Sequence, residues 1–243
     1  MRRKIFFIGA LAASLSVTKP VFAETDKEIL FRDIPWGTSY TDAVQLQPDF
    51  DWYTIAFDES RITTLNEILT GDVSWDGYNN NGLDFPAMPF SDHETDVAGY
   101  TTSDIYMYFA YTPVDGVLTR DESLTALYGA KYEFEPQNLQ SMYDDIENKL
   151  TSLYGDPDNV TADKGWTGAK NTYTWWYGAN DSVVVLGKSD FSEVDSDLFK
   201  DELWISYAWE KGDELLKAAD DAISQSNSDA EASIYGNGST NGL

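Results

Sequence analysis

One segment of the chain gathers side chains of the types that proteins use to bind neutral polar ligands. Residues 72–96 (DVSWDGYNNNGLDFPAMPFSDHETD) are dominated by Gly, Asn, Asp and Pro, a composition that predicts a long loop. Within this loop, aromatic rings stand beside amides and carboxylates at Trp75, Asp76, Tyr78, Asn80 and Asp84. Exposed rings in such surroundings are typical of a site for a glycan or a peptide. The alternative is that the Trp75 ring folds back onto the body of the protein as an anchor.

The sequence lacks the residues that histidine-based catalysis would need beside a histidine. His93 is the only histidine, and it lies between acidic residues of the same loop. No Gly-x-Ser-x-Gly motif accompanies it, a histidine zinc site would have no second histidine, and no glycine-rich phosphate loop is present. We therefore predict a non-enzymatic chain with no catalytic residue, no cofactor and no metal ligand. Glycoside hydrolysis stays open as an alternative, because spacing alone cannot select two carboxylates from 42 acidic residues.

Calcium binding is a second chemistry to consider in an acidic chain. The strict loop pattern requires Asp or Asn at its first, third and fifth positions. The segment DPDNVT, from Asp156, has Val160 at the fifth position, and DSDLFKDE, from Asp195, has Phe199 there. An irregular site in DGYNNNGLD (76–84) stays open, with turn formation by Asn and Asp as the alternative.

The stretch IPWGTSYTDAV (34–44) predicts the start of a short helix. Ser39 suits the N-cap, Asp42 places a negative charge in the first turn, and Pro48 ends the helix. Because the cap and the acid already serve the exposed N–H groups, an anionic ligand is disfavoured there. We interpret Trp36 as a structural peg, with Gly37 giving the backbone room to turn.

The N-terminal residues have the order of a secretory signal peptide. A basic start at Arg2, Arg3 and Lys4 precedes an apolar run, Ile5–Val17, and small Ala23 follows. That run is shorter than the roughly 20 residues that cross a bilayer. We expect cleavage after residue 23 and a secreted protein, in the extracellular or cell-envelope space, with no membrane attachment in its mature form.

The amino-acid composition limits the kinds of molecule that this chain is expected to bind. The whole chain has a net charge of −26, and residues 24–243 alone, with 12 basic and 42 acidic residues, carry −30. Such a charge repels nucleic acid and anionic lipid, and it suits cationic or neutral partners such as another exported protein or a neutral glycan. The absence of cysteine excludes a disulfide framework, and the length suffices for a core without one.

Hydrophobic periodicity predicts an α+β fold. We expect an antiparallel sheet of about five or six strands with helices packed mainly on one face. The domain would span 24–225, with a smaller N-terminal lobe over 24–92 left open and an unstructured polar tail over 226–243. Strands are expected within 51–58, 105–111, 125–135, 171–187 (a hairpin) and 201–209, and helices near 40–46, 62–70, 137–154 and 212–224.

In the strand 125–135, Tyr128, Ala130, Tyr132 and Phe134 are expected on one face, against Lys131, Glu133 and Glu135 on the other. Trp175, Trp176 and Trp204 are expected in the core.

The opening FRDIPWGTSYTDAV resembles the start of small envelope domains of the β-lactamase-inhibitor-protein and small outer-membrane-lipoprotein class. The matching positions are Ile34, Gly37, Ser39 and Val44. The segment YEFEPQNLQSMYDDIENKLTSLYGDP (132–157) is similar to uncharacterised secreted proteins of bacteria, in which a long helix closes with Tyr-Gly-x-Pro. This resemblance implies an exported binding or scaffold domain, with an inhibitor or chaperone-like partner of another exported protein as one alternative. A glycan-handling protein that uses the loop around Trp75 is the other.

Overall fold

We describe the protein from a computed structural model. The structure describes residues 28–48, 50, 52–54, 64–71, 87–92, 95–165, 167–194 and 199–235. Every statement about the structure below concerns these ranges.

Eight strands form one sheet in which every neighbouring pair is antiparallel. This confirms the expected mixed α/β fold with an antiparallel sheet, although the sheet is larger than five or six strands. In spatial order the strands are β1 (Tyr53–Thr54), β2 (Ala87–Asp92), β5 (Asp104–Tyr111), β6 (Thr125–Phe134), β10 (Glu202–Trp209), β9 (Ser182–Asp190), β8 (Lys170–Tyr177) and β7 (Asn159–Lys164). A separate pair, β3 (Asp96–Val97) and β4 (Tyr100–Thr101), lies outside this sheet.

Four strands were not expected from the sequence: β2 and β7 of the eight-stranded sheet, and the separate pair β3 and β4. All six side chains of β7 are exposed, so neither of its faces is buried in a core, and the short alternation of Val160 and Ala162 with polar residues is only a weak signal. The range 72–96 was expected to be loop throughout, and this is wrong for β2 and for β3. A proline inside β2 argued against a strand, but β2 lies near the sheet edge, where proline is tolerated, and β1 pairs with only Phe90 and Ser91 of it.

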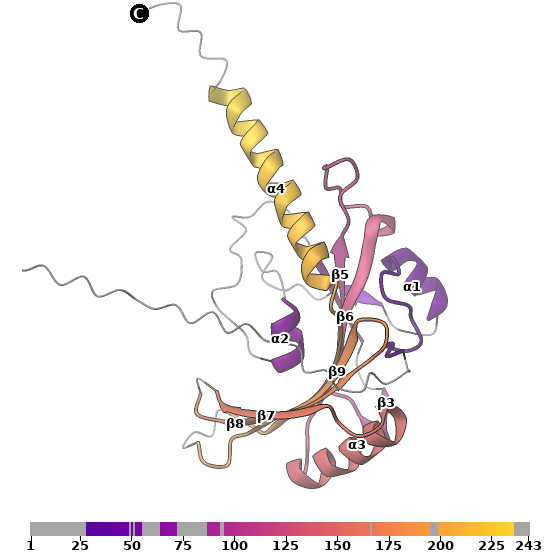
Figure 1. The fold of residues 1–243 in the computed structure, drawn as a ribbon, viewed down its shortest axis with the longest axis vertical. Coiled ribbons are helices and arrows are strands. Elements are labelled where there is room, and N and C mark those ends of the chain that lie inside the picture. The colour runs from indigo at the N-terminus through magenta and orange to yellow at the C-terminus, as the bar shows by residue number, and fades with distance from the viewer. Residues whose placement is uncertain are drawn as a thin grey trace, which may run out of the picture.

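The helices cover both faces of the sheet, so the expected packing mainly on one face is not confirmed. One face carries α1 (Tyr40–Leu46) and α3 (Leu139–Tyr154), and the other carries α2 (Leu65–Thr70) and α4 (Gly212–Tyr235), as Figure 1 shows. A 3-10 turn, η1 (Glu122–Leu124), precedes β6.

Helices lie on both faces of the sheet because the central strands are apolar on both faces. On β10, six consecutive residues are buried, and neighbours such as Trp204 and Ile205 belong to opposite cores.

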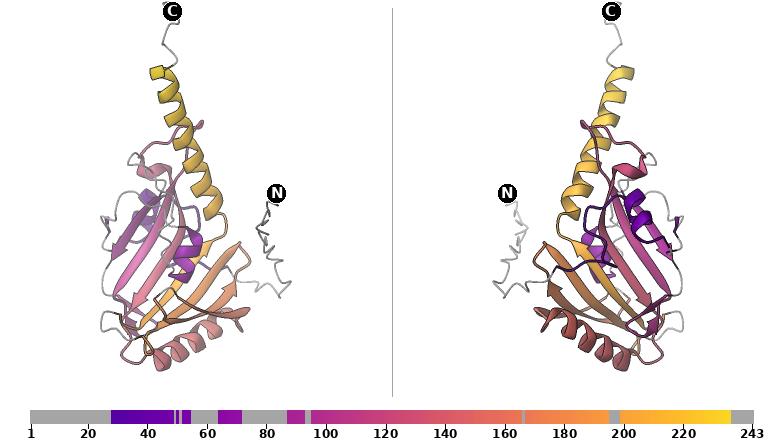
Figure 2. Two further views of the ribbon diagram at one scale, coloured as in Figure 1. Left: turned by 90° about the vertical axis from the view of Figure 1, so that its left-hand side faces the viewer. Right: turned by 90° about the vertical axis from the view of Figure 1, so that its right-hand side faces the viewer.

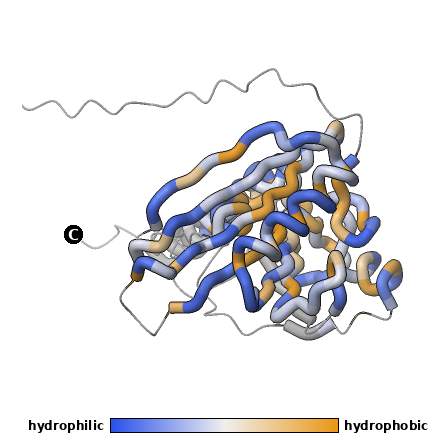
Figure 3. The backbone as a smooth tube through the Cα atoms, turned by 90° about the horizontal axis from the view of Figure 1, so that it is seen from below, coloured by the Kyte–Doolittle hydropathy of each residue, from blue (hydrophilic) through white to orange (hydrophobic). Residues whose placement is uncertain are grey.

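Each face therefore has its own core. The core beneath α3 includes Ile146 and Leu150 of the helix and the fully buried Trp176 of β8. The core beneath α2 and the start of α4 includes Ile68, Tyr128 and Trp204. Viewed from below, apolar residues gather in the middle of the body while hydrophilic residues dominate its outlying segments (Figure 3).

A β-bulge in β6 changes which residues share a face. The pairing with β5 shifts at Tyr108/Phe109, so that Tyr128 is an extra residue on β6. Tyr128 consequently belongs to the α2 core, whereas Ala130, Tyr132 and Phe134 belong to the α3 core. The expectation that these four residues share one face fails at Tyr128 for this reason.

The local signals for helix ends agree with the structure. Ser39 caps α1 by accepting a hydrogen bond from the Asp42 amide at 3.1 Å. Gly71 ends α2 in the left-handed conformation that glycine adopts without strain (φ 69°). Trp36 packs on the α3 core and donates its indole N–H to the Ile29 carbonyl at 2.8 Å, as expected of a structural peg.

The last helix is longer than the periodicity suggested. It continues to Tyr235, so residues 226–235 are helical rather than an unstructured tail. The buried apolar residues that are described in this helix, Leu216, Ala219, Ala222 and Ile223, lie in its first half, and the far half projects beyond the body (Figure 2). An apolar stripe marks only the docked half, which is why periodicity ended the helix early. None of the helices in the described ranges is long and apolar enough to cross a membrane.

Candidate functional site

A groove with a volume of about 920 Å³ opens at one end of the sheet, on the face that also carries α2. Its walls come from the end of β6, the starts of β5 and β10, the residue after α2 (Gly71) and the connections that lead into α3 and β10. A volume of this size lies within the range of about 300–1,000 Å³ that ligand pockets occupy. The groove is therefore the candidate site among the described residues.

Sheet register brings the polar side chains of the groove together. Asp104 of β5 pairs with Glu133 of β6, which pairs in turn with Trp204 of β10. Lys131 and Glu202 lie two positions away from this row, and side chains two residues apart in a strand point to the same face. The groove thus combines residues from three strands that are far apart in the sequence.

Lys131 lies deep in the groove. Its side chain is only 13% exposed, it forms an ion pair with Glu133, and its ammonium stands 5.4 Å from the centre of the Trp204 ring. This distance and the aromatic face fit a cation–π contact. The site therefore already holds one ammonium group, between a carboxylate and an indole.

Glu202 has an altered acidity. Loss of water around its carboxyl raises its pKa above the ordinary value; the Lys131 ammonium opposes this shift and the Glu133 charge adds to it. The Glu133 charge thus acts on Glu202 across neighbouring strands. The two carboxylates also differ in environment, because the ammonium of Lys131 contacts Glu133 directly.

The Trp204 ring is held in place by contacts on several sides. Its indole N–H donates to the Leu69 carbonyl at 3.1 Å, and Tyr173 packs edge-on against it. Gly187 lies under the ring, since a Cβ built at Gly187 would stand 2.2 Å from Trp204 Cε2. Gly71 approaches it on the α2 side, where a built Cβ would stand 3.2 Å from Cζ2. These contacts fix the position of the Trp204 ring in the wall of the groove.

The opposite rim is aromatic. The rings of Phe191 and Phe199 stack with centroids 5.3 Å apart and planes 9° from parallel, and Phe199 is 38% exposed. The Asp201 carboxylate accepts the Phe191 amide hydrogen bond at 2.9 Å, which holds the two ends of the β9–β10 connection together. Exposed aromatic area at the rim of a polar groove is suited to contact with a ligand.

The charge of the groove is negative. Five carboxylates and two ammonium groups line it, which gives a net charge of −3; the acids are Asp104, Glu133, Glu135, Asp201 and Glu202, and the bases are Lys131 and Lys200. A cationic or neutral polar ligand fits such a lining, and an anion is repelled.

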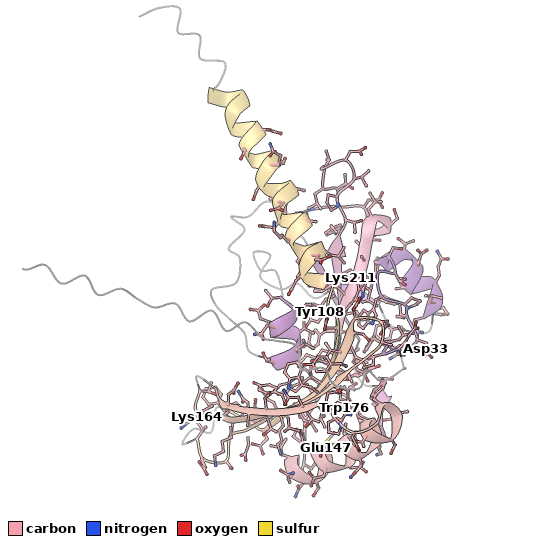
Figure 4. The ribbon with its side chains drawn as sticks, viewed as in Figure 1. Asp33, Tyr108, Glu147, Lys164, Trp176 and Lys211 are labelled. Atoms are coloured by element: carbon pink, nitrogen blue, oxygen red, sulfur yellow. The ribbon has the colours of Figure 1, made fainter. Side chains whose placement is uncertain are left out.

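The other face of the sheet carries a buried polar chain with a structural role. The hydroxyls of Tyr143 and Thr174 lie 2.5 Å apart, and Thr174 donates to Glu147 at 3.2 Å. Burial raises the pKa of Tyr143 to about 12. In Figure 4, Glu147 and Trp176 lie on the α3 side of the sheet and Tyr108 lies toward α2. The chain joins α3 to β8.

The ligand residues expected from the sequence are Trp75, Asp76, Tyr78, Asn80 and Asp84, and all five lie outside the described residues, as does His93. The expectation about them stays a prediction. Gly71, which lines the groove, precedes Trp75 by only four positions. No group of three or more His, Cys, Asp or Glu side chains that could hold a metal ion occurs in the described ranges.

Sequence reasoning missed the groove itself. The available signal was the polar side of the β6 alternation, formed by Lys131, Glu133 and Glu135. Trp204 was assigned to the core, and it is indeed 3% exposed while it also lines the groove. Only the sheet order shows that these residues meet.

Comparisons of the chain with protein-family models, with curated proteins and with solved structures found no match in any of the three.

Proposed function

We propose that this chain is an exported, non-enzymatic binding protein that takes its ligand in the groove between β6, β10 and the Phe191–Phe199 rim. The observation that carries the proposal is the lining: an indole wall and an exposed aromatic pair enclose several carboxylates. Such a combination of apolar walls with a few convergent polar groups is the usual composition of a ligand pocket.

Export is the part of the proposal that the N-terminal sequence supports. The order of basic, apolar and small residues up to Ala23 predicts a cleaved signal peptide. N-terminal sequencing of the protein recovered from culture supernatant or the cell envelope tests this. A mature chain that begins at or next to Glu24 is expected, and an intact Met1 on the recovered protein would contradict it.

The binding claim is tested with the mature protein and one pair of matched variants. Phe199→Ala removes the exposed ring at the rim, and Val160→Ala removes a residue of β7 that is 56% exposed and lies outside the groove lining. A panel of neutral oligosaccharides and peptides of both charge signs is screened by isothermal titration calorimetry. A ligand whose affinity falls in Phe199→Ala but not in Val160→Ala supports the groove. A ligand that is indifferent to both variants places binding elsewhere.

A glycan-handling protein is the second candidate, and the glutamate pair favours it. Glu202 has a raised pKa, and Glu133, on the strand next to it, is ion-paired with Lys131. Two neighbouring carboxyl groups, one of them with a raised pKa, are what glycoside hydrolysis requires. Release of reducing ends from a polysaccharide, lost in Glu202→Gln, would replace the non-enzymatic proposal with this one.

A partner role toward another exported protein is the third candidate, because of one protruding turn. Val114 and Val117 are 50% and 61% exposed and flank the Asp115–Gly116 turn, where both residues have positive φ. Two apolar side chains on a pre-shaped hairpin tip suit insertion into a partner. If a co-purifying exported protein is lost in Val117→Asp but kept in Phe199→Ala, the tip rather than the groove is the binding surface.

A further inference from the structure

We propose that the ligand of the groove is an extended basic segment of another polypeptide, one of whose lysine or arginine side chains reaches the carboxylates of Glu133 and Glu202. This inference rests on the proposed binding function of the groove and names the chemistry of its ligand. The proposed ligand is a peptide, and the test below distinguishes it from small amines and neutral glycans.

The charge of the groove is complementary to the charge of a basic peptide. The lining has a net charge of −3 and the whole chain has −26, so both the local and the long-range fields attract a cation. Glu202 shows that the negative charges are crowded, since the nearby Glu133 charge further raises a pKa that desolvation has already raised. A cation from a ligand would relieve this repulsion, whereas a neutral glycan would leave it in place.

The groove already holds one ammonium group, in the surroundings that the lysine side chain of a ligand would need. The chain's own Lys131 lies against the Glu133 carboxylate and 5.4 Å from the centre of the Trp204 ring, with its side chain largely enclosed. A carboxylate beside an aromatic face is a favourable site for a cation with an aliphatic stem. Lys131 therefore acts as an internal competitor for the cation of a ligand.

The size of the groove and its apolar rim also favour a peptide over a small amine. A groove of about 920 Å³ exceeds what a single amine fills, while it lies near the upper end of known ligand pockets. The stacked Phe191–Phe199 pair offers apolar area beside the carboxylates, which suits the aliphatic stems and backbone of a peptide. A free metal ion or a small diamine would leave this rim uncovered.

The test uses the mature protein and synthetic peptides with blocked ends. The probe has the sequence Gly-Ala-Lys-Ala-Gly-Lys-Ala-Gly-Lys-Ala-Gly; its matched partners carry norleucine or Glu at the three Lys positions. Spermidine and a neutral hexasaccharide complete the set. Calorimetry at low and at physiological salt measures Kd, and the indole N–H signals in NMR spectra report on the tryptophans, with Trp204→Phe for assignment. We expect the Lys peptide alone to bind, with an affinity that falls as salt rises.

Two variants that change the groove in opposite directions make the result specific. The double variant Glu133→Gln, Glu202→Gln is expected to raise Kd by about tenfold or more, because it removes two charges that contact the cation. Lys131→Met is expected to lower Kd several-fold, because it removes the internal competitor. The control, Asp115→Asn with Asp229→Asn, makes the same change in net charge at exposed positions outside the groove lining. It should change Kd by less than twofold.

Every other result would contradict the proposal, and each result points to a different explanation. Equal losses in the control and in the groove variant would show a diffuse charge effect. Tight binding of spermidine would assign a small amine instead of a peptide. Binding of the hexasaccharide or of the norleucine peptide that is lost in Phe199→Ala would keep the proposed binding function and reject the cation. If no probe binds and the broader panel also finds nothing sensitive to Phe199→Ala, the binding function fails as well.

Discussion

Gly187→Ala should be one of the most costly small substitutions in this protein, because Gly187 makes room for the Trp204 ring. A Cβ at residue 187 would stand 2.2, 2.3 and 2.5 Å from Cε2, Cζ2 and Nε1 of Trp204. The ring cannot simply tilt away, since its N–H is bonded to the Leu69 carbonyl and Gly71 and Tyr173 flank it. Either the ring leaves its place or β9 and β10 must separate locally.

The magnitude follows from these contacts. Overpacking in a well-filled core costs about 1–3 kcal/mol. Losing the indole hydrogen bond adds about 1 kcal/mol, so we expect a loss of about 2–4 kcal/mol in the free energy of unfolding. For a domain of this size, about 2–4 °C in Tm accompanies each kcal/mol.

Urea unfolding followed by circular dichroism measures the change. Gly116→Ala is the matched control, because a Cβ there meets no atom of the described residues within 4 Å and the strain comes from its positive φ (77°). Its cost should stay near 1 kcal/mol. The double variant Gly187→Ala, Trp204→Leu should lose far less than the sum of its single variants, since the clash is absent without the indole. A Gly187→Ala protein within 0.5 kcal/mol of the parent, with its Trp204 indole signal unmoved, would refute this reading of the wall.

Three further outcomes follow from the described contacts. Asp33→Gly should raise the free energy of unfolding by about 0.5–1 kcal/mol, because Asp33 has φ 60° in a two-residue turn that favours glycine; urea midpoints measure it. Thr64→Ala should lower that free energy by about 1 kcal/mol, since Thr64 and Glu67 form a capping box at α2, and an unchanged midpoint would show that α2 does not depend on it. The pKa of Glu202 is raised in the folded state above its ordinary 4.5, so its protonated form is the better accommodated one and stability falls as pH rises through the raised value. Glu202→Gln should therefore be more stable than the parent at neutral pH and lose this advantage below about pH 4.5, whereas a constant difference across pH would contradict it.

What the sequence predicts well here is local. The caps at Ser39 and Gly71 act within one turn of their helices, so a few neighbouring residues determine them. The apolar stripe of α3 and the hairpin of β8 and β9 are of the same kind, because each brings its pattern and its turn within one short segment.

The parts that the sequence did not predict depend on distant neighbours. β7 is a strand because β8 lies beside it, and all six of its own side chains are exposed rather than buried in a core. The helices lie on two faces because the central strands are apolar on both, which their runs of buried residues reflect only after the strand order is known. The groove needs the same long-range information, because Asp104, Glu133 and Trp204 become neighbours only through the order β5, β6, β10.

The bulge in β6 connects the groove to the core. Before it, Leu127 points to the α3 core; after it, Lys131 and Glu133, which share the parity of Leu127, point to the groove face instead. Without the extra residue, the charged side chains would turn toward the α3 core, and Tyr132 would turn toward the groove face. Re-aiming of side chains is a known use of bulges beside functional sites.

The glycine of this bulge also seats α2. A Cβ at Gly129 would stand 2.6 Å from Ile68 Cδ1, so the bulge leaves just enough space for the helix whose end, at Gly71, lines the groove. One inserted position therefore determines both which charges line the groove and how closely its α2 wall approaches. Deleting Tyr128 should abolish the cooperative unfolding transition along with ligand binding, because every later residue of β6 would face the wrong side. Glu133→Gln, by contrast, should weaken binding and leave that transition in place, and the contrast between the two variants separates the architecture of the groove from its chemistry.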